Sequence, residues 1–261
     1  MKVKFCCLGS GSEGNSIVVK TESSSKTTVL VDCGIKFDDL ENRLLSRGID
    51  LSEIDAIFIT HEHIDHIRSA LKFAKVFNTP IFMTHGSFYS VYKSYEKINS
   101  VSIIRADNTV VFNDLKIAPF SIPHDAREPV ALIIQDTAHK LGVLTDTGSI
   151  TPNIVRSMAN LDGVVLEFNY DEIMLKKSDY PEKLKKRISS PYGHLSNKAA
   201  TYLLEKIFHQ NIQAIVAAHL SKKNNNPDLV SSKLKLFKND ALKKIIADQS
   251  EPTGWISLNK S

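Results

Sequence analysis

The sequence predicts an α/β protein, a four-layer αββα sandwich in which two mixed β-sheets pack face to face with helices outside. Short β-branched runs are followed by helices, and the same order then recurs later in the chain. The chain has 261 residues, 42% of them hydrophobic, which is enough for one large core. We therefore expect one domain over residues 1–261, although periodicity alone leaves other α/β layouts open.

The first third of the chain contains four predicted strands and two predicted helices. The strands are expected at residues 3–8, 16–19, 28–31 and 56–60. A helix over 37–47 is expected to end at Gly48, a residue type that commonly follows the last helical residue. Apolar residues recur at helical spacing from Ile64 to Phe77, which predicts one amphipathic helix directly after the fourth strand.

The rest of the chain is β-rich at first and then alternates helices with strands. Strands are expected at 101–104, 110–112, 115–120, 129–135, 140–145, 163–168, 213–217 and 245–247. Helices are expected at 152–158, 171–187, 196–208 and 229–237. Two runs of strands, each accompanied by helices, indicate the two mixed sheets.

Charge and cysteine content narrow the class of protein. The net charge of +4 is compatible with a polyanionic partner without requiring one. We expect neither a signal peptide nor a membrane-spanning segment, because the first residues lack the signal-peptide pattern and no apolar run reaches membrane-spanning length. The three cysteines (Cys6, Cys7 and Cys33) form no Cys-x-x-Cys pair, which favours a reducing compartment. We expect a cytoplasmic protein that needs no membrane and no obligate protein partner.

A glycine-rich segment near the start suggests a nucleotide site that its context does not support. Residues 9–14 match G-x-G-x-x-G, and Asp32 follows at the distance of a ribose-binding acid. Dinucleotide binding requires a helix directly after the motif, because the helix N-terminus binds the pyrophosphate. A short β-branched run follows here instead. We therefore expect the glycines to form a tight turn beside a site.

The most informative feature is the cluster His61-x-His63-x-Asp65-His66. The two histidines at the end of an extended segment project to the same side, and the next two residues begin the following helix. Four candidate ligands thus converge within six residues. Imidazole and carboxylate groups suit zinc and manganese. The pattern predicts a metal site.

Further candidate ligands follow hydrophobic β-runs later in the chain. They are His124, Asp146 and His219. Ligand-binding residues in open α/β sheets gather at the carboxyl ends of strands, so a common position for all these side chains is physically reasonable.

In this order, Asp32, the 61–66 cluster, His124, Asp146 and His219 resemble the five motifs of the metallo-β-lactamase superfamily. The resemblance covers nearly the whole chain and implies the αββα fold of that type with two divalent metal ions, zinc or manganese, with iron as the alternative. It implies one metal at His61, His63 and His124. It implies the other at Asp65, His66 and His219, with Asp146 bridging both. Asp32 would orient the ligands from behind.

Further segments are similar to the YycJ/WalJ-like exonuclease family within this superfamily. They are 9–15 (GSGSEGN), 166–171 (LEFNYD), 193–196 (GHLS) and 219–222 (HLSK), together with Asn224 and Asn225. The resemblance implies a metal-dependent phosphodiester hydrolase, a 5′-to-3′ exonuclease with DNA favoured over RNA as substrate. Two metals can lower the pKa of a bridging water toward neutrality, which would supply a hydroxide to attack the phosphate.

Other candidate residues complete the predicted site. Asp65 is expected to be essential for catalysis. By similarity to related phosphodiesterases, His194 is expected to contact the phosphate or protonate the leaving oxygen, oriented by Glu167. Candidate substrate-binding residues are Ser12, Asn15, Asn169, Ser221 and Asn225, although serine and asparagine are equally common in turns. Basic groups such as 183–187 are compatible with a phosphate backbone or with a solvated helix face.

Two other functions remain open at this stage. One is a hydrolase of the same fold that acts on a thioester, a lactone or a small cyclic phosphodiester, which a deep narrow pocket would favour. The other, from a different class, is a di-iron redox or binding protein. Proteins of that kind usually carry a flavin module, for which this chain has no length. A catalytically silent scaffold fits poorly with candidate ligands at every motif.

Overall fold

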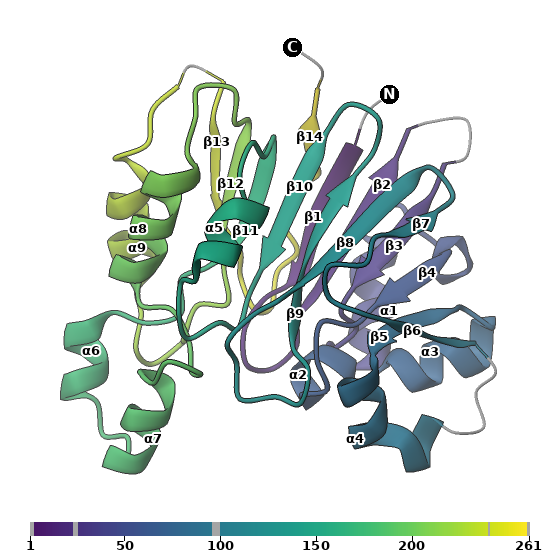
Figure 1. Ribbon diagram of the computed structural model, residues 1–261, viewed down its shortest axis with the longest axis horizontal. Helices are drawn as coiled ribbons and strands as arrows, with labels where there is room; N and C mark the ends of the chain where they lie inside the picture. Colours follow the sequence, from purple (N-terminus) through teal and green to yellow (C-terminus); the bar gives the residue numbers. More distant parts are fainter. Residues whose placement is uncertain (1–2, 23–25, 96–99, 240, 260–261) are drawn as a thin grey trace.

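The computed structural model describes residues 3–22, 26–95, 100–239 and 241–259; the ends of the predicted domain, residues 1 and 261, lie outside them. Two seven-stranded sheets pack face to face, and helices cover their outer faces (Figure 1). The predicted four-layer αββα sandwich is confirmed. No helix of the described ranges is both long and apolar enough to cross a membrane.

The first sheet has the strand order β14-β1-β2-β3-β4-β5-β6. Its strands are β1 (Val3–Gly9), β2 (Ser16–Thr21), β3 (Thr28–Val31), β4 (Ala56–Phe58), β5 (Ile81–Thr84), β6 (Val101–Ile104) and β14 (Ile256–Leu258). Neighbours are antiparallel from β14 to β3 and parallel from β3 to β6. Its outer face carries α1 (Phe37–Leu45), η1 (Leu51–Glu53), α2 (Ile64–Ile67), α3 (Ala70–Phe77) and α4 (His85–Tyr95).

The second sheet has the order β13-β12-β11-β10-β9-β8-β7. Its strands are β7 (Val110–Phe112), β8 (Leu115–Ser121), β9 (Val130–Gln135), β10 (Lys140–Leu144), β11 (Gly163–Glu167), β12 (Ala214–Ala218) and β13 (Lys243–Ile246). Neighbours are antiparallel from β7 to β10 and parallel from β10 to β13. The helices that follow its strands are α5 (Pro152–Ser157), α6 (Glu172–Lys177), α7 (Glu182–Ile188), α8 (Asn197–Ile207) and α9 (Pro227–Leu234).

Side chains alternate between the layers because successive strand residues face opposite sides of a sheet. In β11, Val165 packs between the two sheets, whereas Val164 and Leu166 pack against the helices outside. In β1, Phe5 likewise lies between the sheets and Cys6 on the helix side. Both faces of these strands are therefore buried, which explains their nearly continuous hydrophobic runs.

Two of the predicted helices are broken in the structure. The helix expected over 64–77 divides into α2 and α3, because the Ser69 amide donates to Cys33 O at 2.9 Å instead of continuing the helix. The stretch expected over 171–187 divides into α6 and α7 at Pro181, since the residue before a proline disfavours helical conformation. Both corrections concern helices beside the predicted site.

Four elements were not predicted. They are η1, β5, α4 and β14. The glycine-rich segment 9–14 leads from β1 into β2 and not into a helix. The β-branched run that was expected after the glycines, and that argued against dinucleotide binding, is therefore confirmed as a strand.

The polar loops gather at one edge of the sandwich. Strands β1, β3 and β4 of one sheet and β8, β10, β11 and β12 of the other all end there. Helix α2 marks this edge at the bottom of Figure 1, opposite the edge where the two termini lie.

Candidate metal centre and active site

The structure brings all the metal ligands predicted from the sequence to this edge. They are His61, His63, Asp65, His66, His124, Asp146 and His219. Four follow β4 directly, and the other three follow β8, β10 and β12. Because these strands end at one edge, residues up to 158 positions apart in the chain become neighbours.

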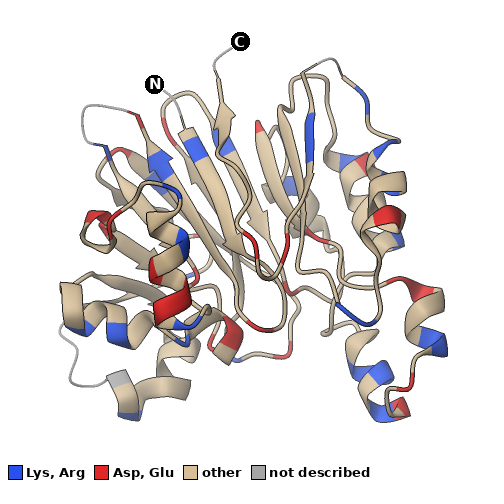
Figure 2. Cartoon of the chain, turned by 180° about the vertical axis from the view of Figure 1, so that it is seen from behind, with Lys and Arg blue, Asp and Glu red and all other residues tan. Residues whose placement is uncertain are grey.

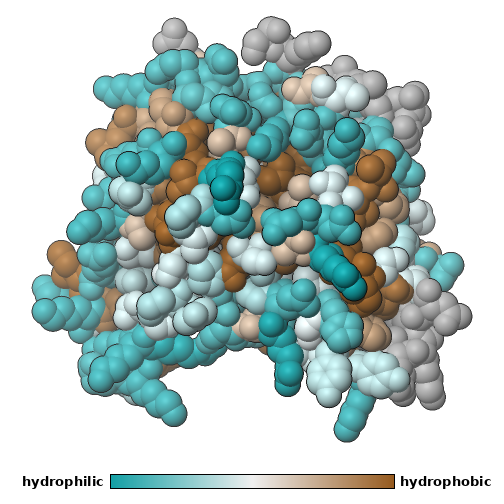
Figure 3. Space-filling model, in the orientation of Figure 1, coloured by the Kyte–Doolittle hydropathy of each residue, from teal (hydrophilic) through white to brown (hydrophobic). Residues whose placement is uncertain are grey.

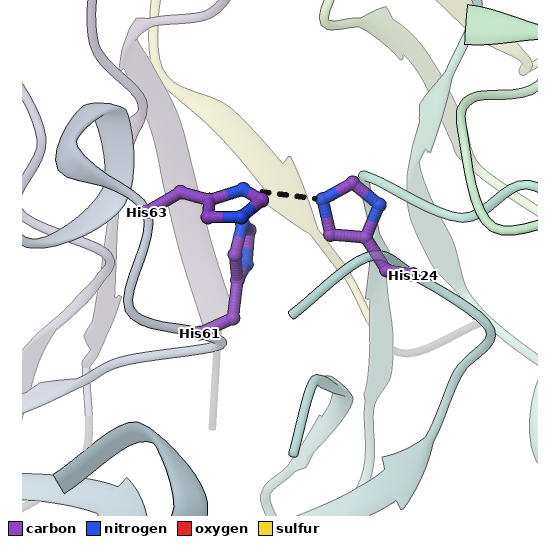
Figure 4. A group of neighbouring side chains, drawn as sticks. All are labelled: His61, His63 and His124. Atoms are coloured by element: carbon purple, nitrogen blue, oxygen red, sulfur yellow. Dashed lines mark hydrogen bonds between the residues drawn. The ribbon is translucent and has the colours of Figure 1, made fainter. Parts of the chain in front are cut away.

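One group consists of three imidazoles. His61 and His63 come from the loop after β4 and face His124 from the opposite sheet (Figure 4). Their candidate ligand atoms all lie within 4.8 Å of one another. His124 Nε2 is 3.3 Å from His63 Nδ1. This spacing allows one cation to contact all three rings.

A second group consists of Asp65, His66 and His219, whose candidate ligand atoms also lie within 4.8 Å of one another. Asp65 Oδ2 is 3.6 Å from His66 Nε2 and 3.7 Å from His219 Nε2. Asp146 forms a further set with His61 and His66, so its carboxylate lies between the two groups. This is the position that the resemblance implies for a bridging ligand, and the bridging role stays a prediction.

Asp32 and Thr60 orient two of the rings from behind. Asp32 Oδ2 accepts from His66 Nδ1 at 2.8 Å. Thr60 Oγ1 donates to Asp32 at 3.0 Å and lies 3.1 Å from His61 Nδ1, which must then be the donor of that contact. Both rings therefore carry their proton on Nδ1 and present the Nε2 lone pair to the centre.

Two more rings are oriented in the same way. His124 Nδ1 donates to Gly193 O at 3.1 Å, and His219 Nδ1 donates to Glu167 Oε1 at 2.9 Å. A carbonyl or carboxylate behind the ring is the usual partner of a metal-binding histidine.

Three buried polar atoms at the centre have no hydrogen-bond partner among the described residues. They are His61 Nε2, His219 Nε2 and Asp146 Oδ2. Asp146 Oδ2 lies 3.1 Å from His66 Nε2 without forming a hydrogen bond. Buried polar atoms left unpaired cost free energy, and here they are a carboxylate oxygen and imidazole nitrogens that converge. The donor set fits divalent metal ions, so this His/Asp cluster is capable of binding them.

The charge balance also favours a cation. Burial and the neighbouring His66 hold the pKa of His61 well below its usual value, so this ring is neutral as a ligand must be. Burial disfavours charge on His219, but Asp146, Asp65 and Glu167 together outweigh it and raise the pKa of His219 to about 10. His219 and His66 in turn hold the pKa of Asp146 well below its usual range, against the effect of burial. The buried carboxylates thus require positive charge beside them, from protons or from metal.

Three site residues have left-handed backbone conformations at strand ends. Their φ angles are 60° at Asp32, 57° at Asp146 and 56° at His219. This conformation costs roughly 1–2 kcal/mol for a residue with a Cβ atom, and such cost concentrates at functional sites.

His194 lies beside the second group. Its Nδ1 is 2.8 Å from Glu167 Oε1, and its side chain is 22% exposed whereas Glu167 is fully buried. Burial works against the charged ring, but Glu167 raises the pKa of His194 above its usual value. Glu167 therefore joins His194 to His219 from a fully buried position, and its catalytic role stays a prediction.

The residues predicted to bind substrate occupy different environments. Asn15 is buried, with its amide 3.1 Å from His66 Nε2, and Asn169 Nδ2 donates to His219 O at 2.9 Å. Asn225 is buried and donates to Phe168 O. These three side chains are hydrogen-bonded within the chain, and substrate contact stays a prediction for them.

Ser12 and Ser221, the other two predicted substrate-binding residues, are more accessible. Ser12 is exposed. Ser221 is half-buried and lines a cavity of about 340 Å³ with Ser10 and Leu220. Ser10 Oγ in turn accepts from the backbone N–H of His219 at 2.8 Å.

Sequence reasoning missed three residues that shape the site. Thr60 links Asp32 to His61, and Glu62 accepts from Arg127 N at 2.9 Å. A Cβ atom at Gly34 would overlap the carbonyl of Asp65. Thr60 and Glu62 adjoin the cluster, but the contacts of Thr60 with Asp32 and of Glu62 with Arg127 depend on the fold, and no local motif predicts them.

Comparisons with known proteins identify the family of this chain. A family model described as a beta-lactamase superfamily domain matches residues 27–220. The chain is 31% identical to "Exodeoxyribonuclease WalJ" of Streptococcus pneumoniae over 87% of this chain and 84% of the relative. It is 28% identical to "Exodeoxyribonuclease YycJ" of Bacillus anthracis over 88% of this chain and 86% of the relative.

Solved structures show the same fold. The metallo-beta-lactamase fold protein YhfI from Bacillus subtilis has a TM-score of 0.74 at 17% identity, covering 96% of this chain and 99% of that one. Zn²⁺-bound PqqB from Methylobacterium extorquens has a TM-score of 0.72 at 15% identity, covering 99% and 100%. The chain therefore belongs to the beta-lactamase superfamily of metal-dependent hydrolases and, within it, to the family of the YycJ and WalJ proteins.

Proposed function

We propose that this protein is a dinuclear metal-dependent exonuclease that degrades DNA from 5′ ends. The observation that carries the proposal is the set of unpaired ligand atoms at the centre, with His194 beside them. The names of the two relatives, both exodeoxyribonucleases matched over most of their length, support phosphodiester hydrolysis and DNA as the substrate.

In this proposal His61, His63 and His124 hold one divalent cation, Asp65, His66 and His219 hold the other, and Asp146 contacts both. The two cations, zinc or manganese, would activate water and neutralise charge on the phosphate oxygens. The geometry that supports the assignment is the two groups of candidate ligand atoms within 4.8 Å, with Asp146 between them.

His194 supplies the proton for the leaving oxygen. Its Nδ1 is fixed on Glu167 at 2.8 Å, so the opposite nitrogen, Nε2, is the one available to substrate. Glu167 stabilises the protonated ring, which keeps a proton available at neutral pH. A general acid of this kind typically contributes about 10² to 10⁴ in rate.

We further propose that one hydrolase domain spans residues 1–261, because one core cluster contains residues of both sheets. The three cysteines are free and buried, which supports a reducing, cytoplasmic site of action.

The test is hydrolysis of end-labelled single-stranded and double-stranded DNA and RNA by the purified protein with Mn²⁺ or Zn²⁺. We expect mononucleotides or short products from the 5′ end of DNA. Blocking the 5′-terminal linkages with phosphorothioates should stop the reaction, whereas blocking the 3′ end should not. Asp65→Ala should abolish hydrolysis, and Asp38→Ala, a carboxylate 89% exposed on α1, is the matched control.

Three results would change the conclusion. Cleavage that proceeds from 3′ ends would overturn the direction, and faster cleavage of RNA would overturn the substrate. Turnover of a thioester, a lactone or a cyclic phosphodiester, without cleavage of any nucleic acid, would favour a small-molecule hydrolase of the same fold.

A further inference from the structure

The helix α7 places a cation beside the candidate metal centre. Lys and Arg positions, blue in Figure 2, recur on α6 and α7, which lie beyond the strand ends. Hydrophilic residues also predominate at the lower left of the space-filling view, where α7 lies (Figure 3). Lys185 is bound to other residues of α6 and α7, because it donates to Lys176 O at 3.0 Å and pairs with Glu182. Arg187 instead contacts the site.

Arg187 is joined to a candidate metal ligand through one carboxylate. Its Nε donates to Asp125 Oδ2 at 2.6 Å, and Asp125 Oδ1 is 3.4 Å from His124 Nε2. The guanidinium is therefore one side chain removed from the nitrogen that His124 presents to the centre.

The remaining donors of Arg187 are available to a ligand. Its side chain is 61% exposed, and Nη1 and Nη2 make no hydrogen bond within the part of the chain that the structure describes. A guanidinium held at Nε keeps its outer nitrogens in a fixed planar fork, which matches the oxygens of a phosphate.

The backbone at the end of α7 is fixed to the same site. His194 N donates to Ile188 O at 2.9 Å, and Gly193 O accepts from His124 Nδ1 at 3.1 Å. A Cβ atom at Gly193 would overlap the carbonyls of Arg187 and Ile188, so glycine alone permits this close approach. The position of Arg187 is thus set before any substrate binds, which lowers the entropic cost of binding.

We propose that Arg187, oriented by Asp125, binds the phosphate next to the scissile phosphate of a polynucleotide. The inference rests on the proposed nuclease function and assigns one residue to substrate recognition. Asp125 is the positioning residue. A phosphate at the metal centre and a phosphate at Arg187 would lie on opposite sides of the Asp125 carboxylate, so one strand can contact both.

The alternative is that the Arg187–Asp125 pair only attaches α7 to the body. A surface ion pair of this kind is worth little in stability and would have no effect tied to one linkage of the substrate. A substrate that loses one charge at a chosen linkage therefore distinguishes the two roles.

The experiment uses the metal-loaded protein and a series of 5′-phosphorylated oligodeoxynucleotides, each with one neutral methylphosphonate at a different linkage near the 5′ end. We expect the wild type to lose about 10-fold in kcat/KM at one linkage flanking the scissile one, as for a hydrogen bond to a charged group. Arg187→Ala should lose a similar factor on unmodified DNA, mainly through KM. It should show no further loss with the methylphosphonate.

Salt dependence gives an independent measurement. Because Arg187 is assigned to one phosphate, the slope of log(kcat/KM) against log salt should become shallower by about 1 in Arg187→Ala. Lys206→Ala is the matched control, since Lys206 lies in the last turn of α8. It removes one positive charge and should leave the methylphosphonate penalty at its wild-type value. Metal content and thermal unfolding of each variant show whether it is folded and binds metal. If Arg187→Ala fails either check, Arg187→Lys replaces it.

The results separate two failures. If the wild type cleaves DNA and Arg187→Ala keeps the methylphosphonate penalty, the assignment of Arg187 is wrong and the exonuclease proposal stands. If no flanking linkage is sensitive in the wild type, the assignment is also wrong. If the wild type cleaves no DNA at all, both proposals are wrong.

Discussion

Replacing Glu167 by glutamine tests how this protein sets the protonation of its histidines. Each carboxylate oxygen accepts two hydrogen bonds. Oε1 accepts from Nδ1 of His194 at 2.8 Å and of His219 at 2.9 Å. Oε2 accepts from the amides of Thr147 at 3.1 Å and Leu195 at 3.0 Å. The glutamine has the same shape, but its NH₂ group must face one of these two pairs of donors.

The two orientations have different costs. An NH₂ group facing the backbone amides would leave buried donors unpaired, at roughly 1–3 kcal/mol each. Facing the imidazoles costs less, because each ring can move its proton from Nδ1 to Nε2 and accept from the amide. His219 would then present N–H to the centre in place of a lone pair. We expect the affinity for the metal held by His219 to fall at least 10- to 100-fold.

Two measurements check this prediction. Metal content after dialysis against a weak chelator should fall from two ions per chain toward one in Glu167→Gln. Long-range ¹H–¹⁵N NMR spectra of the protein in Zn²⁺ should show a protonated Nδ1 and an unprotonated Nε2 on His219 in the wild type, and a protonated Nε2 on His219 in Glu167→Gln. The control is Glu62→Gln, because Glu62 lies within the 61–66 cluster but bonds to Ser87 and the Arg127 amide, not to an imidazole.

The reasoning would be refuted if Glu167→Gln bound both ions with wild-type affinity while His219 kept its Nδ1–H tautomer. Loss of both ions together with unfolding would show that Glu167 acts on the fold and not on the tautomer. Full metal retention in Glu62→Gln is required for either interpretation.

Three further predictions concern the same site. His194→Ala should keep both metals and lose about 10² to 10⁴ in kcat on DNA, but much less on a p-nitrophenyl phosphodiester, whose leaving group needs no proton; equal losses on both substrates would exclude the general-acid role. Gly34→Ala should destabilise the protein by at least roughly 1–3 kcal/mol, because the new Cβ overlaps the Asp65 carbonyl. Its melting temperature is to be compared with that of Gly254→Ala, where no atom lies within 4 Å of the added Cβ, and equal values would contradict the close approach. Removing metal with a chelator should lower Tm by about 10 °C relative to protein with metal at 1,000 times its Kd, and an unchanged Tm would show that no metal binds the native state.

The sequence identified the fold and the candidate ligands because both depend on local patterns. A strand buried on both faces reads as a hydrophobic run, as in β12, and the candidate ligand His219 directly follows that run. Imidazole and carboxylate groups at such positions have few other uses, so His124 and His219 could be identified without knowing their neighbours.

Long-range contacts explain what could not be predicted. The break between α2 and α3 depends on Cys33 O, which lies far from Ser69 in the sequence. Strand β14 pairs with β1 from the other end of the chain. Asn169 and Asn225 have the residue type of substrate contacts, but the carbonyls that engage them come from the fold.

The position of metal in crystals tests the central claim most directly. Crystals grown with Mn²⁺ should give two anomalous difference peaks about 3.5–4 Å apart. One should lie against His61, His63 and His124, the other against Asp65, His66 and His219, with Asp146 in contact with both. A single peak, or peaks elsewhere on the protein while these side chains keep their present positions, would contradict a dinuclear centre at this edge.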